Sequence, residues 1–143
     1  MQYNRYRVSS YNSTAESDIR NLITYEVSFL TGYETFVPFN VEEINGNGVV
    51  EKTVSVPNGS TETFKFNGFS SGVSGCVKVK NEKFANAGVK HKMGTKYIGY
   101  DFENGIFFHK SGNRGDKLKN SDVPEVEERS TSEWTGWEIG LGR

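Results

Sequence analysis

The stretch that decides the fold class reads Ile98-Gly99-Tyr100-Asp101-Phe102-Glu103-Asn104-Gly105-Ile106-Phe107-Phe108. Alternate residues in its first half are large and apolar, which is the period of a strand with one buried face. The pair Asn104-Gly105 separates this half from a second apolar run, and both residues tolerate the positive φ of a tight turn. The stretch therefore predicts two antiparallel strands joined as a hairpin.

Similar short runs of alternating residues recur along the chain, at 22–31, 50–56, 63–66, 75–80 and 137–141. The clearest is 22–31, because Ile23, Tyr25, Val27 and Phe29 are separated there by polar side chains. Strands at intervals of roughly 8 to 12 residues are typical of sandwiches. We predict an all-β fold, a single antiparallel β-sandwich of about eight or more strands that forms one domain over residues 1–143.

Two segments depart from this pattern. Residues 13–22 favour a helix of about two turns, since Ser13 and Glu16 can form a capping box, and we expect at most one short helix in the protein. Residues 111–132 are rich in charged and polar side chains and predict a long polar surface loop within the domain.

Charge and composition restrict the classes of function. The net charge of −1 gives no overall attraction to nucleic acid, so we expect no nucleic-acid partner. No signal peptide or membrane span is evident, which predicts a protein made in soluble form, cytoplasmic until release and then acting extracellularly on target membranes. The single cysteine, Cys76, offers neither a disulfide nor a zinc site, so we expect no metal and no cofactor.

An enzyme is the class that the residues favour least. Only His91 and His109 are available as the usual general base, and neither lies in a recognisable catalytic motif. Both are more readily interpreted as structural or exposed residues. We therefore predict a binding protein without catalytic residues.

Lysines form the first candidate binding set. Between Cys76 and Lys96 six lysines are opposed by one acidic residue, Glu82. Lys78, Lys80, Lys90 and Lys92 are the candidates for contact with phosphates, lipid headgroups or an acidic partner. The alternative is that these lysines only solvate an edge strand and discourage aggregation.

Aromatic residues form the second candidate set, with Tyr97, Phe107, Trp134 and Trp137 as its members. Such rings suit a membrane interface or stack on sugars, but they also fill cores. Trp134 and Trp137 are three positions apart, an odd number, so one regular strand would not bury both. We expect at least one of the two tryptophans to be exposed.

The order of elements resembles the aegerolysins, a family of small β-sandwich cytolysins, and more remotely the actinoporins and fungal fruit-body lectins. The resemblance rests on Asn21–Leu30 as an early strand, on the turn Val56-Pro57-Asn58-Gly59-Ser60, and on the entry Gly72-Val73-Ser74-Gly75. The Trp-Asp-Cys-Pro-Trp stretch of fungal members is absent, so their lipid-contact residues do not transfer to this chain. The resemblance implies recognition of a membrane lipid or cell-surface receptor, often together with a larger pore-forming protein partner.

These observations lead to three hypotheses of function. The first is a non-catalytic membrane-recognising component of a pore-forming or insecticidal toxin. The second is a carbohydrate-binding lectin, in which an exposed ring stacks on a glycan. The third is a structural partner-binding module that docks on another protein.

Overall fold

A computed structural model describes residues 2–142 of the protein, with the side chains of residues 5–142, so the ends of the predicted domain, Met1 and Arg143, lie outside the described residues. The elements are α1 (Gln2–Tyr33), β1 (Val50–Ser55), β2 (Thr61–Phe66), β3 (Val73–Lys80), β4 (Phe84–His91), β5 (Lys96–Asp101), β6 (Ile106–Ser111) and β7 (Glu138–Ile139). Short 3₁₀ helices lie at Val41–Glu43, Asn120–Asp122 and Ser132–Trp134. Strands β3-β4-β5-β6-β7 form one antiparallel sheet, and β1 and β2 form another.

The prediction of an all-β fold is confirmed only in part, because the protein is mostly β with antiparallel sheets but also contains a helix, and two details of the prediction are wrong. The described residues contain seven strands rather than about eight or more. The helix is not short, since α1 spans 32 residues. The segment 13–22, predicted as a helix of two turns, is the middle of this longer helix.

The strand predicted at 22–31 is therefore wrong. The buried residues of α1 follow the spacing of one helix face: Ala15, Asp18, Ile19, Leu22, Glu26 and Phe29. Val27, which the strand pattern placed on the buried face, is 42% exposed. The alternation misled because Glu26, a polar residue, occupies the buried stripe.

The predicted hairpin at 98–108 is confirmed. Strands β5 and β6 pair in antiparallel register from Lys96 opposite Ser111 to Asp101 opposite Ile106. The connection has four residues, Phe102–Gly105, rather than the two of a type I′ turn, and Gly105 adopts a φ of 66°. The Asp101 carboxylate accepts hydrogen bonds from the backbone N–H groups of Glu103 and Asn104, which holds the turn.

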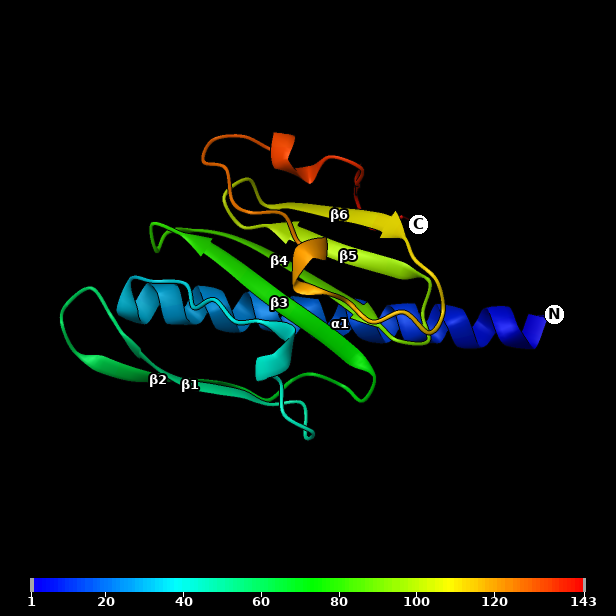
Figure 1. Cartoon of the computed structure of the whole chain (residues 1–143), viewed down its shortest axis with the longest axis horizontal. Coiled ribbons are helices and arrows are strands. Elements are labelled where there is room, and N and C mark those ends of the chain that lie inside the picture. Colours follow the sequence, from blue (N-terminus) through cyan, green and yellow to red (C-terminus); the bar gives the residue numbers. More distant parts are fainter. Residues whose placement is uncertain (1, 143) are drawn as a thin grey trace.

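The two faces of the five-stranded sheet have different covers (Figure 1). Helix α1 packs across one face, where Ile19 and Leu22 join the core cluster that contains Val89 and Ile98. The segment between β6 and β7 packs on the other face, through buried Leu118, Val123, Val126 and Trp134. The segment 111–132, predicted as a long polar surface loop, thus buries apolar side chains against the sheet.

The β1–β2 hairpin joins the same core as α1. The Phe64 ring lies 5.0 Å from the Tyr25 ring and 5.5 Å from the Phe29 ring, both edge to face. A backbone bridge between Phe39 and Val77 connects the segment after α1 to the edge of β3. The two sheets and the helix therefore share one hydrophobic cluster.

Candidate functional site

The N-terminal part of α1 extends past the sheet (Figure 1). A helix of 32 residues is about 48 Å long, whereas a strand of 8 residues spans only about 26 Å. The first fully buried residue of the helix is Ala15, and the described side chains before it are exposed or half-buried. Most side chains of residues 5–14 are thus exposed, while Tyr11 and Asn12 contact His91 and Thr95 at the end of the sheet.

The exposed segment, residues 5–14, has a composition that would give a helix of low stability in isolation. Ser9, Ser10 and the three residues Asn12-Ser13-Thr14 have low helix propensity. The first turn carries no acidic residue, while Arg5 and Arg7 place positive charge near the positive end of the helix dipole. The segment is helical because it continues a packed helix, so that it needs no nucleus of its own.

The exposed segment displays residue types that are common at protein interfaces. The Tyr6 side chain is 77% exposed and lies between Arg5 and Arg7, which are also exposed. The Arg7 guanidinium donates to the Tyr11 hydroxyl at 3.3 Å. Tyr11 anchors the base of the segment, since its ring lies 4.4 Å from the ring of His91.

The candidate lysines do not form one surface. Lys78 pairs with Glu125 at 3.0 Å and Lys80 with Glu128 at 3.8 Å, so both ammonium groups hold the loop that covers the sheet. Lys92 is exposed in the turn after β4. Lys90 is fully buried and is not available to a membrane or to a phosphate in this conformation.

The Lys90 ammonium is held by backbone oxygens. Its Nζ donates to the carbonyls of Asp116 at 2.7 Å and Asn113 at 2.9 Å, and to those of His91 and Gly94 at 3.1 Å. Burial lowers the pKa of Lys90, and the charges of Asp116 and Asp122 oppose that shift. The ammonium thus ties the β4–β5 turn to the loop after β6.

The candidate aromatic residues lie on both faces of the sheet. Trp134 is buried and stacks on Phe108 with ring centroids 4.6 Å apart, so it belongs to the core and not to a membrane-contact surface. Trp137 is half-buried and meets the Trp134 ring edge to face at 5.0 Å. Phe107 lies on the α1 side, where the Arg20 guanidinium is 5.0 Å from its ring. One tryptophan is thus partly accessible, but the set forms no single patch.

Tyr97 and Trp137 share a cation. The Lys110 Nζ lies 5.2 Å from the Tyr97 ring and 4.8 Å from the Trp137 ring. These distances fit cation–π attraction, which holds the two rings and the ammonium together. These three side chains are half-buried on the sheet face that the loop after β6 covers.

The cluster of polar side chains that most resembles a catalytic triad consists of Asp18, Ser70 and His91. Ser70 donates to the Asp18 carboxylate through both its backbone N–H, at 2.7 Å, and its hydroxyl, at 3.0 Å. The Nδ1 atom of His91 accepts from the backbone N–H of Met93 at 3.0 Å. The hydroxyl therefore bonds the carboxylate rather than the imidazole, and the group ties α1 to the chain before β3.

Glu26 is a buried acid in the core. Its Oε1 accepts from the backbone N–H of Val37 at 2.9 Å, and its Oε2 has no hydrogen-bond partner among the described residues. Burial raises the pKa of Glu26 to about 8, although the Val37 bond and the charge of Lys52 oppose this rise. Glu26 is thus largely protonated at neutral pH and fixes the segment after α1 against the helix.

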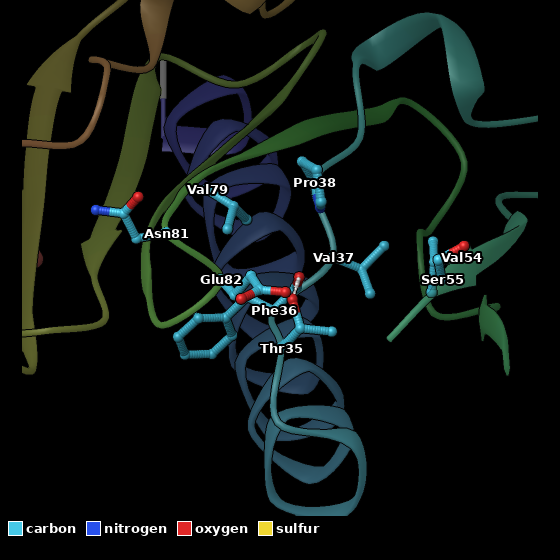
Figure 2. Close-up of a pocket in the computed structure, with 9 residues that line it drawn as sticks. All are labelled: Thr35, Phe36, Val37, Pro38, Val54, Ser55, Val79, Asn81 and Glu82. Carbon is cyan, nitrogen blue, oxygen red and sulfur yellow. Dashed lines mark hydrogen bonds between the residues drawn. The ribbon is translucent and has the colours of Figure 1, made fainter. Parts of the chain in front are cut away.

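A groove of about 360 Å³ lies between this segment, the end of β1 and the end of β3, and Figure 2 shows the residues that line it. Val37, Val54 and Val79 supply much of its apolar lining. The Thr35 hydroxyl already donates to the Phe36 carbonyl at 2.8 Å. The groove is therefore mainly a shallow apolar junction between the two sheets.

Neither a metal site nor a membrane-spanning helix is found within the part of the chain that the structure describes. No group of three or more His, Cys, Asp or Glu residues there could hold a metal ion. None of the described helices is both long and apolar enough to cross a bilayer. No protein-family model matches the sequence, and neither the curated proteins nor the solved structures contain a match to it.

Proposed function

We propose that the protein is a non-catalytic partner-binding module that docks on another protein through residues 5–14 of α1. The observation that carries the proposal is the extension of α1 past the sheet with Tyr6 exposed at its surface. Tyr11 and Asn12 contact the end of the sheet through His91 and Thr95, whereas residues 5–10 extend beyond these contacts. Their cost in conformational entropy is offset if a partner packs against them.

The side chains of the segment suit a protein partner. Tyrosine and arginine are the residue types most often found as energetic hot spots in interfaces. An amphipathic helix commonly binds by laying one face into a groove of its partner. Because Arg5 and Arg7 flank Tyr6, the partner groove is expected to combine an apolar pocket with acidic residues at its rim.

Site-specific photo-crosslinking in the cells that make the protein tests this proposal. A photoreactive residue replaces Tyr6 in one variant and Tyr33, at the opposite end of α1, in a matched control. The proposal predicts a discrete adduct with one protein at position 6, lost on Arg5→Glu/Arg7→Glu substitution, and no such adduct at position 33. Equal labelling at both positions, or labelling at 6 that survives the charge reversal, would contradict it.

Membrane recognition within a toxin and glycan binding stay predictions from the sequence. Support for the toxin is weaker than for the docking module because Lys90 and Trp134 are buried. Co-sedimentation with anionic, sphingolipid and sterol vesicles checks the first prediction, and a glycan array checks the second. The sandwich description of the fold is likewise a proposal, in which the β1–β2 sheet forms a second layer beside α1 over the shared core.

A further inference from the structure

A polar pocket of about 410 Å³ lies at the opposite end of β3 from the groove of Figure 2. Four segments that are distant in the sequence line it: the chain around the first 3₁₀ helix, the start of β3, the turn after β4 and the loop after β6. Its polar side chains are Glu42, Asn45, Ser74, Lys92 and Lys117. Its volume lies in the range of small-molecule sites.

The two lysines of this pocket carry uncompensated charge. Lys52, Lys78 and Lys80 each form an ion pair. Among residues 5–142, by contrast, neither Lys92 nor Lys117 has a hydrogen-bond or ion-pair partner for its ammonium group. The pocket therefore places two available cations on walls formed by different loops.

The backbone fixes both cationic walls. The Lys92 N–H donates to the Gly72 carbonyl at 2.8 Å, and the Lys92 carbonyl accepts from the Gly115 N–H at 2.7 Å. The Lys90 ammonium bonds carbonyls in both loops, and Leu118 beside Lys117 is buried under the sheet. The site is preorganised, so little ordering of its backbone opposes binding.

The remaining polar groups suit hydroxyl groups more than a second anion. Asn45 Oδ1 already accepts from the N–H groups of Asn47 and Val49, which leaves its amide nitrogen to donate. The Glu42 carboxylate lines the pocket, and its Oε1 accepts from the Asn120 amide at 2.8 Å. A carboxylate acceptor disfavours a purely anionic ligand and favours one that also offers O–H donors.

We propose that this pocket binds an acidic sugar, with its carboxylate or phosphate between Lys92 and Lys117 and its hydroxyls on Asn45, Ser74 and Glu42. In the proposed complex the half-buried apolar side chains of Val41 and Ile44, which line the pocket, contact the C–H face of the ring. The assignment does not depend on the docking of α1, since no residue of α1 lines the pocket.

Titration of the full chain by heteronuclear NMR tests the site. The probes are glucuronic acid, glucose 6-phosphate, glucose and inorganic phosphate. At least one acidic sugar is expected to shift the amides of Asn45, Ser74, Lys92 and Lys117 in a saturable manner. Glucose and inorganic phosphate are expected to bind at least about tenfold more weakly, a difference of about 1.4 kcal/mol.

Matched variants separate the pocket from general electrostatic attraction. Lys92→Gln/Lys117→Gln is expected to weaken binding of the acidic sugar at least about tenfold, whereas Lys83→Gln, an exposed lysine in the turn before β4, leaves it unchanged. The proposal is overturned if no acidic sugar gives saturable shifts, if inorganic phosphate or glucose binds equally well, or if the double variant retains full affinity.

Discussion

Replacement of Glu26 by glutamine should change how the stability of the protein depends on pH. The pKa of Glu26 is raised from 4.5 to about 8 in the folded protein by burial. An acid whose folded pKa is raised stabilises the fold most below its unfolded pKa, because the folded state holds its proton more tightly. That stability is lost progressively as the pH rises from 4.5 to about 8.

The size of the effect follows from the same two pKa values. The full shift corresponds to about 5 kcal/mol, of which about 2 to 3 kcal/mol falls between pH 5 and pH 7. The glutamine side chain keeps the size of Glu26 and its acceptor for the Val37 N–H but does not ionise. Glu26→Gln should therefore remove this part of the pH dependence.

Urea unfolding of the wild-type protein and Glu26→Gln at pH 5 and pH 7 measures the difference. Asp18 and His91 titrate in both proteins, so their contributions cancel in the comparison. We expect the wild-type protein to lose about 2 to 3 kcal/mol more than the variant on going from pH 5 to pH 7. Identical losses in the two proteins would refute the reasoning.

Three further predictions concern packing and are all measured by urea unfolding. Lys90→Met leaves the carbonyls that bind the ammonium without a donor, so it should lower the free energy of unfolding by about 2 to 5 kcal/mol. A loss below about 1 kcal/mol would contradict the structural role of the ammonium. Gly99→Ala should cost about 1 to 3 kcal/mol, because the added methyl group meets the Trp134 ring, and unchanged stability would contradict that packing. Phe64→Ala should lower the free energy of unfolding by about 3 to 5 kcal/mol, whereas Tyr6→Ala should lower it by less than about 0.5 kcal/mol. Similar losses for the two variants would show that Tyr6 is packed within the chain.

Local patterns in the sequence predicted most of the strands but not β4, and they predicted only residues 13–22 of the helix. The hairpin at 98–108 could be found because its alternation and its Asn104-Gly105 pair are neighbours in the chain. The full length of the helix was missed because Asp18 and Glu26 lie on its buried face and hide the 3.6-residue period. Their partners, Ser70 and Val37, are supplied by segments that follow the helix.

The cover of the second sheet face could not be found in the sequence for a similar reason. The loop after β6 packs there because Gly88 and Gly99 leave space for Val123 and Trp134, and nothing local pairs these positions. Burial of Lys90 depends on carbonyls of Asn113 and Asp116, which are more than twenty residues away. Charge alone therefore predicted an exposed lysine.

The candidate sites were predicted only in part. Lys92 was identified by the excess of lysines in its segment, and the structure places it in a pocket with Lys117. Lys117 was missed because it lies in a segment without periodicity, where a lysine is most simply interpreted as solvated. The exposed part of α1 gave no signal, since its serines, threonine and asparagine are equally common in loops.

Hydrogen exchange of the complex captured through position 6 tests the central claim most directly. In the protein alone, the amides of residues 5–12 should exchange rapidly and those of 19–29, on the packed part of α1, slowly. In the complex, residues 5–12 should become protected by at least about tenfold, with little change at the edge strand β1 or around Trp137. Protection at β1 or Trp137 with none in residues 5–12 would contradict the proposal that the protein docks through the exposed end of α1.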